Sequence, residues 1–211
     1  MNTPFRVGIG HDTHRLIPGD GFRLGGIPIP HDKKLLGHSD ADVLLHAVID
    51  ALLGAAAMGD IGEMFPDTDE KNRGRSSVEM LRLAWSRVQN LGWKLQNLDC
   101  IVFAQRPKLS DYKDDIARSI AETLGVTPQQ VNIKAKTGEG IGPVGEELVM
   151  EAQCVALLTG SQTVSELKVK SHAASRPASV VPGVSPVPSV SSTISTTTKA
   201  LFAEAGKRKN F

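Results

Sequence analysis

The pattern of apolar and polar positions predicts a chain in which strands and amphipathic helices alternate. Residues 43–58 are mostly apolar and follow Ser39, a favoured N-cap residue, with Asp42 three positions later. This spacing resembles a capping box, so we expect a helix whose N-terminus lies near these residues. Apolar residues recurring every three or four positions predict two more helices, at 76–92 with a second capping box and at 112–125.

Strands are predicted where apolar and polar residues alternate or where a short apolar run stands between turns. These segments are 5–14, 98–105, 131–137 and 149–158, with a short hairpin at 23–29. Pro28 and Pro30 confine the hairpin to the edge of a sheet, because proline cannot donate to a strand ladder. The order of elements predicts a layered α+β domain with helices on one face of a sheet.

A change of composition predicts that the folded domain ends near residue 160. Between Ser171 and Lys199, 16 of 29 residues are Ser, Thr or Pro, and charged residues are scarce. Such a segment has too little apolar surface to compensate for the entropy of ordering it. We therefore expect a folded domain over residues 1–160 and a disordered tail over residues 161–211.

The net charge of +1 conceals an acidic domain and a basic tail. Of 24 basic and 23 acidic residues, the tail holds 7 and 2, which leaves 17 and 21 in residues 1–160. An acidic domain without a basic patch does not favour nucleic-acid binding, and a phosphate-bearing ligand would need a metal ion for positive charge. We also expect no membrane segment and no signal peptide, hence a cytoplasmic protein, in which Cys100 and Cys154 are buried free thiols rather than a disulfide.

Three residues have the chemistry of a catalytic metal site. Asp12 and His14 are two positions apart on an expected strand and point to the same side, and His46 lies on a polar edge of the first expected helix. On spacing alone, a metal site and a pair of histidines that only form hydrogen bonds are equally compatible with the sequence. Asp42 and Asp50, each one turn from His46, are candidates to orient its second ring nitrogen or are solvated carboxylates.

Two further segments have glycine or polar residues where phosphates are often bound. His38 and Ser39 lie beside the N-terminus of the first expected helix, where amide groups and the macrodipole favour an anion; a turn histidine without a ligand is the alternative. The stretch 138–142 reads Gly-x-Gly-x-Gly and is followed by Pro143 where a binding helix would begin. We therefore do not interpret it as a dinucleotide-binding loop.

Eight motifs in order along residues 5–159 together resemble the 2-C-methyl-D-erythritol 2,4-cyclodiphosphate synthases of the non-mevalonate isoprenoid pathway. They are Gly-His-Asp-Thr-His at 10–14, His-Ser-Asp-Ala-Asp at 38–42, Leu-His-Ala at 45–47, Asp-Ala-Leu-Leu-Gly-Ala-Ala at 50–56, Gly-Asp-Ile-Gly at 59–62, Phe-Pro-Asp-Thr-Asp at 65–69, Ala-Gln-Arg-Pro-Lys at 104–108 and Val-Asn-Ile-Lys-Ala-Lys-Thr at 131–137. The resemblance implies an α+β fold with a mixed four-stranded sheet, helices packed on one face, and a homotrimer with active sites at subunit interfaces.

The resemblance also implies a reaction, cofactors and catalytic residues. The family converts 4-diphosphocytidyl-2-C-methyl-D-erythritol 2-phosphate to the cyclic diphosphate and releases CMP. Carried onto this sequence, Asp12, His14 and His46 would hold a divalent metal, usually zinc, while magnesium or manganese would bridge the substrate phosphates. His38 and Thr137 would be catalytic by aligning and stabilising the reacting phosphates. The 2-phosphate itself attacks the β-phosphorus, so no protein nucleophile is required.

The implied substrate contacts form groups along the chain, for the metal-bound phosphates, the methylerythritol, the cytidine and the other phosphates. The metal-bound phosphates would contact Asp12, Thr13, His14, His38 and Ser39, and the methylerythritol would contact Asp60, Ile61, Gly62, Phe65, Pro66, Asp67, Thr68 and Asp69. The cytidine would contact Ala104, Gln105, Arg106, Pro107, Lys108, Leu109 and Ser110. The other phosphates would contact Lys136, Thr137, Gly138, Glu139, Pro143 and Glu146.

The sequence departs from the usual family pattern at two of these positions. Glu146 stands where many relatives have the arginine of Gly-Arg-Gly-Glu, and Pro143 replaces a commoner aromatic residue. We hypothesise that Lys136, at a position where others often have threonine, restores the lost positive charge.

Two other functions are compatible with the two histidines and one carboxylate. An iron-dependent oxygenase would use them as a facial triad, but it leaves His38, the loop at 67–69 and the turn at 106–108 without a role. A metal-stabilised trimeric binding protein would unfold on chelation. A fusion with the preceding cytidylyltransferase is excluded by length, because one domain fits.

Overall fold

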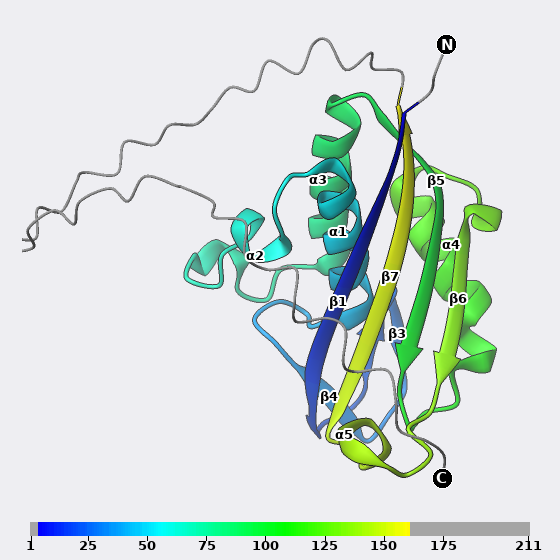
Figure 1. Cartoon of the computed structure of the whole chain (residues 1–211). Helices are drawn as coiled ribbons and strands as arrows, with labels where there is room; N and C mark the ends of the chain where they lie inside the picture. Colours follow the sequence, from blue (N-terminus) through cyan, green and yellow to red (C-terminus); the bar gives the residue numbers. More distant parts are fainter. Residues whose placement is uncertain (1–3, 161–211) are drawn as a thin grey trace, which may run out of the picture. The chain divides into compact units, whose positions relative to one another are not determined.

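The computed structural model of the chain describes residues 4–160, and these residues form a five-stranded mixed sheet with helices on one face (Figure 1). The strand order is β4-β1-β7-β5-β6. The strands are β1 (Phe5–Pro18), β4 (Lys33–Leu36), β5 (Trp93–Phe103), β6 (Val131–Lys136) and β7 (Val149–Gly160). β5 and β6 pair in parallel and the other neighbours pair antiparallel, so the sheet is mixed as expected.

The helices that cover this face are the three expected from the periodicity, and each long helix buries an apolar side. They are α1 (Val43–Ala56), α3 (Ser77–Asn90) and α4 (Lys113–Leu124). Short elements make the connections: β2 (Phe22–Leu24) and β3 (Ile27–Ile29), which form a separate two-stranded sheet, α2 (Ile61–Met64), α5 (Gly142–Gly145), and 3₁₀ turns at Glu70–Asn72, Leu109–Tyr112 and Pro128–Gln130.

The expected count of four strands in the main sheet is wrong, because β4 is a fifth strand at its edge. β4 pairs with the last part of β1, from Arg15 opposite Leu36 to Pro18 opposite Lys33. Four residues with one buried side chain, Leu35, carry too little alternation to be recognised as a strand in the sequence. The same pairing extends β1 beyond its expected end at residue 14.

The N-termini of the first two long helices also differ from the expected capping. Asp42, not Ser39, is the N-cap of α1, and its Oδ1 accepts a hydrogen bond from Leu45 N at 3.1 Å. Ser76 precedes α3 but makes no side-chain cap; the carboxylate of Asp40 instead accepts from Ser77 N at 3.2 Å. Both helices are therefore capped by the acidic residues of the loop before α1.

The centre of the fold is the packing of β1 against α1. Gly8 and Gly10 face the helix, and a Cβ on either would lie within 2.0 Å of a carbonyl oxygen of α1, at Ala51 and Ala47. Only a residue without a side chain permits this approach. Since Asp12 and His14 continue the same face of β1, the close packing carries them toward His46 on α1.

The opposite face of β1 is apolar and uncovered by any of residues 4–160. Phe5, Val7 and Ile9 are 65%, 69% and 71% exposed, and Val155 of the neighbouring β7 is also exposed. Figure 1 shows α1, α3 and α4 on the other side of the sheet. A contiguous apolar surface of this kind is typical of an interaction site.

The remaining expectations concern the two cysteines, membrane-spanning helices and the C-terminal tail. Cys100 and Cys154 are buried free thiols, as predicted, with their sulfur atoms 3.4 Å apart across β5 and β7. Within residues 4–160, no helix combines the length and the apolar character needed to cross a bilayer. The tail predicted for residues 161–211 lies outside the described residues.

We predict that Gly8→Ala lowers the free energy of unfolding by about 1–3 kcal/mol, because its Cβ would force β1 and α1 apart. Urea unfolding of the two proteins measures the difference. Gly54→Ala is the matched control: it adds the same methyl group at an exposed position of α1, where its Cβ would lie 3.8 Å from the carbonyl oxygen of Ile9, an ordinary van der Waals distance. Helix propensity makes this change neutral or stabilising by up to about 1 kcal/mol. Equal effects of both changes would contradict the packing argument.

Candidate metal centre and active site

Asp12, His14 and His46 come together where β1 passes α1. Asp12 Oδ2 lies 2.9 Å from His46 Nδ1 and 3.1 Å from His14 Nε2, and the two ring nitrogens are 3.0 Å apart. One ligand atom from each residue therefore lies within 4.8 Å of the others. Two imidazole nitrogens and a carboxylate oxygen fit a divalent ion and leave coordination positions open for a ligand. The structure brings the three predicted residues together, and their donor set suits a divalent metal.

The second ring nitrogen of His14 is held by the backbone. Its Nδ1 lies 3.0 Å from the carbonyl oxygen of Leu36 at the end of β4. A carbonyl can only accept a hydrogen bond, so Nδ1 carries the proton and donates it. In the neutral ring this leaves the lone pair of Nε2 directed at Asp12 and His46. The edge strand that the sequence did not reveal thus orients a candidate ligand.

Neither Asp42 nor Asp50, the two candidates that helical spacing offered, orients His46; both accept hydrogen bonds from backbone groups instead. Asp42 is fully buried and accepts from Gly25 N at 2.9 Å and Gly26 N at 2.7 Å, which joins the β2–β3 turn to α1. Asp50 accepts from Ile61 N at 2.8 Å and anchors α2.

Two serines take that role on His46. Its Nε2 lies 2.9 Å from Ser77 Oγ and 3.1 Å from Ser39 Oγ. Ser77 was not predicted as a site residue, because it was interpreted as part of a capping box. One signal could have identified Ser77: it is a polar residue on the face of α3 that is otherwise apolar and buried.

The pKa values of Asp12 and His14 are shifted by their contacts with each other and with their surroundings. Burial alone would raise the pKa of Asp12, but hydrogen bonds and charges from His14 and His46 bring it well below its usual range. For His14, burial opposes protonation, yet the hydrogen bond and charge of Asp12 raise its pKa above 6.5.

A cavity of about 180 Å³ opens directly beside the three residues. It joins them to six residues predicted to touch phosphate or methylerythritol and to two that were not predicted, Asn72 and Met80. The six predicted residues are His38, Ser39, Ile61, Gly62, Phe65 and Asp67. Met80 lies on the buried stripe of α3, and no local pattern distinguishes it from the other core residues of that helix.

Several predicted methylerythritol contacts shape the loop rather than line this cavity. Asp60 caps α2 by accepting from Glu63 N, Asp69 caps the following 3₁₀ turn by accepting from Lys71 N, and Pro66 O accepts from the amide of Asn72. Pro66, Thr68 and Thr13 are exposed and are not among the lining residues. The side chain of Thr13 lies on the open face of β1, since neighbouring strand residues alternate.

The predicted cytidine loop forms a separate hollow of about 370 Å³. It is lined by every residue from 104 to 110 together with Lys113, Ala135, Lys136 and Thr137, and it shares no lining residue with the metal cavity. Gln105 Oε1 accepts from Gly138 N at 3.2 Å, and Thr137 Oγ1 donates to Glu139 at 2.9 Å. Within one chain, the predicted substrate contacts are therefore gathered at two places.

Arg106 ties the cytidine loop to the turn before β7. Its guanidinium donates to both carboxylate oxygens of Glu147, at 2.6 and 2.8 Å. This hydrogen-bonded pair raises the pKa of Arg106 and lowers that of Glu147. Glu146, its neighbour, follows α5, and Pro143 lines a different depression with Leu16 and Leu148; neither lines the two cavities described above.

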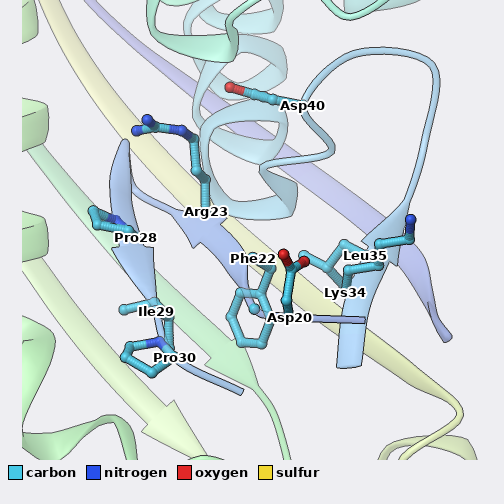
Figure 2. Close-up of a pocket in the computed structure, with 10 residues that line it drawn as sticks. Asp20, Phe22, Arg23, Pro28, Ile29, Pro30, Lys34, Leu35 and Asp40 are labelled. Atoms are coloured by element: carbon cyan, nitrogen blue, oxygen red, sulfur yellow. The ribbon is translucent and has the colours of Figure 1, made fainter. Parts of the chain in front are cut away.

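A further hollow of about 500 Å³ lies between the β2–β3 hairpin and β4 (Figure 2). Its walls are apolar at Phe22 and Ile29 and charged at Arg23 and Lys34. Asp40, the residue that caps α3, lines one end of it. None of the residues proposed to touch substrate is among its lining.

Comparison with known proteins gives one consistent result. The model of the YgbB family matches residues 5–159. Among curated relatives, the 2-C-methyl-D-erythritol 2,4-cyclodiphosphate synthase of Alkaliphilus metalliredigens is 53% identical, with 71% of this chain and 94% of the relative covered; that of Chromobacterium violaceum is 52% identical, with 73% and 98% covered. A solved Plasmodium falciparum enzyme described as a CDP complex has a TM-score of 0.67 and 31% identity, with 77% of this chain and 100% of that chain covered.

We predict that the Asp12 cluster makes the stability of the metal-free protein depend on pH in both directions. Asp12 stabilises the fold above its unfolded value of 3.8 and loses this effect as pH falls, because its folded pKa is lowered. His14 stabilises the fold below 6.5 and loses this effect as pH rises through its raised folded pKa. The free energy of unfolding of the chelator-treated wild type should therefore exceed that of Asp12→Asn by the largest amount between pH 3.8 and 6.5. Urea unfolding of both proteins over this pH range measures the difference. A difference that does not change with pH would show that the pairing is not formed.

Proposed function

This chain belongs to the YgbB family and is a 2,4-cyclodiphosphate synthase, a lyase of isoprenoid biosynthesis, and on that basis we propose how it acts. Its substrate is 4-diphosphocytidyl-2-C-methyl-D-erythritol 2-phosphate. An oxygen of the 2-phosphate attacks the β-phosphorus of the same molecule, the bond from that phosphorus to the CMP oxygen breaks, and the cyclic diphosphate and CMP leave. The iron-oxygenase and binding-protein hypotheses are not retained, because the similar relatives are synthases.

The observation that carries this proposal is the cavity shared by the metal cluster and the phosphate-binding candidates. The residues that line this cavity include Asp12, His14 and His46 together with His38 and Ser39. A divalent ion held there, zinc by this donor set, would polarise the β-phosphate as a Lewis acid. The residues themselves need only orient the phosphates and offset their charge, which agrees with an intramolecular reaction that requires no protein nucleophile.

The residues that line the metal cavity and the cytidine hollow have further proposed roles in binding the substrate. His38, in the metal cavity, and Thr137, in the cytidine hollow, align the phosphates from opposite sides. The loop at 60–69 binds the methylerythritol and the loop at 104–110 binds the cytidine. A magnesium or manganese ion would add positive charge at the substrate phosphates, whose oxygens suit it as ligands. We retain Lys136 as a phosphate contact because it lines the same hollow as Thr137.

We propose that the functional unit is a homotrimer with sites between subunits. The two ends of one small substrate must be bound at once, yet the metal cavity and the cytidine hollow share no lining residue in one chain. The exposed apolar face of β1 and β7 offers the surface through which copies of the chain associate. Assembly through this face brings the cytidine hollow of one subunit to the metal cavity of another.

We predict that phosphorus NMR with this substrate, zinc and magnesium shows the cyclic diphosphate and CMP for the wild type and a loss of roughly 100-fold or more in rate for His46→Ala. The lost ligand removes charge stabilisation from the reacting phosphates. Circular dichroism of the variant separates lost chemistry from lost folding. No product from a folded, metal-loaded wild type would refute the proposed reaction.

We predict that Ile9→Asp converts the trimer to monomers, because it places a carboxylate on the apolar face of β1. Sedimentation velocity measures the change. Leu83→Asp is the matched control, since Leu83 is an exposed apolar residue of α3 on the helical side and the variant should remain trimeric. A wild type that sediments as a monomer at micromolar concentration would refute the assembly.

A further inference from the structure

Hydrogen bonds connect His46 of the metal centre to Ser77, and Ser77 to Asp40 in the loop before α1. His46 is on α1, Ser77 is the first residue of α3, and Asp40 lies in the loop between β4 and α1. His46 Nε2 lies 2.9 Å from Ser77 Oγ, and Ser77 Oγ donates a short hydrogen bond to Asp40 Oδ1. We propose that Ser77 and Asp40 are positioning residues that fix the tautomer of His46, so that its Nδ1 lone pair faces the metal. The proposal rests on the metal site assigned above.

The direction of the hydrogen bonds follows from the chemistry of the groups. A carboxylate can only accept, so the hydroxyl proton of Ser77 goes to Asp40. Ser77 Oγ then has lone pairs but no proton left for His46. The ring must therefore donate from Nε2, and in the neutral ring Nδ1 is left bare. That is the nitrogen 2.9 Å from Asp12 Oδ2, and because a carboxylate cannot donate, this contact is favourable only with a proton or a metal ion between the two atoms.

Because Ser77 and His46 are buried, protein groups rather than water determine which atom donates in each of these hydrogen bonds. Ser77 is 0% exposed and His46 is 7% exposed. Asp40 is itself held, because its N donates to Arg75 O at 3.1 Å and its carboxylate also accepts from Ser77 N. Ser39 Oγ, 3.1 Å from His46 Nε2, is a second acceptor for the ring but lacks a carboxylate to impose a direction.

The consequence at the metal centre is a convergence of acceptors. Leu36 fixes the proton of His14 on Nδ1, and the Ser77–Asp40 pair fixes that of His46 on Nε2. Two ring lone pairs and the carboxylate of Asp12 then meet within about 3 Å with no hydrogen atom between them in the neutral rings. Such a set is stable when a cation lies among them, and a metal ion of tetrahedral preference is suited to it.

Asp40→Asn tests the direction of the chain with little change of shape. Asparagine still caps α3 through its oxygen, but its amide can donate to Ser77 Oγ, which frees the hydroxyl proton for His46 Nε2. The His46 proton then moves to Nδ1, where it obstructs the metal. Asp20→Asn is the matched control: Asp20 lies at the other end of the same hollow, and the variant loses an equal charge without touching Ser77 (Figure 2).

Two measurements on the full chain decide the matter. Nitrogen-15 NMR of metal-free Asp12→Ala, which lacks the carboxylate that competes for a proton on Nδ1, should show the neutral His46 ring protonated on Nε2. Adding Asp40→Asn should shift that proton to Nδ1, which loss of a merely structural contact would not do. Competition with a zinc chelator should give a dissociation constant raised about 10–100-fold for Asp40→Asn and for Ser77→Ala, and unchanged for Asp20→Asn. Thermal unfolding confirms that each variant is folded.

The outcomes separate this proposal from the one on which it rests. If the wild type binds zinc but the neutral His46 ring of Asp12→Ala is protonated on Nδ1, or if Asp40→Asn and Ser77→Ala bind zinc as tightly as the wild type, the positioning role is refuted and the metal site stands. If the wild type binds no zinc, the metal site of the proposed function is refuted, and the NMR measurement still decides the direction of the hydrogen bonds.

Discussion

The close contact between β1 and α1 is the constraint on which the site depends. Gly8 and Gly10 have no side chains to separate the strand from the helix, so the backbones meet directly. Two residues further along the same face, Asp12 reaches His46 at 2.9 Å. The geometry of the metal centre is thus set by residues that cannot bind a metal, and enlarging either glycine would displace ligands that it does not touch.

A polar site on a mostly buried helix is tolerated because its groups are partnered. His46 uses both ring nitrogens, Ser77 uses its hydroxyl and its backbone N, and Asp42 accepts three backbone hydrogen bonds. Within residues 4–160, the buried side-chain atom without a partner is Nε2 of His31, which lies outside this cluster. The energetic cost of burying the cluster is therefore met by long-range hydrogen bonds, and these also make it rigid.

The sequence was sufficient for features that repeat locally and insufficient for those that depend on distant partners. Periodicity located α1, α3 and α4, and the Asp-x-His spacing with one helical histidine identified the metal cluster. It missed β4, whose four residues carry no clear alternation. It also assigned the wrong groups around His46, because the contacts of Asp42 with Gly25 and of Ser77 with Asp40 join residues 17 and 37 positions apart. Local spacing can suggest such partners but cannot choose among them.

One strand serves both the site and the surface of the domain. On its helix side, β1 carries Asp12 and His14; on its open side, it carries Phe5, Val7 and Ile9. Because side chains alternate along a strand, any shift of β1 that improved contacts on one face would move the residues of the other by the same amount. Association through the open face would therefore restrain the metal ligands as well. The two faces of this strand therefore couple the position of the metal ligands to any contact made on the open face, because neither face can move alone.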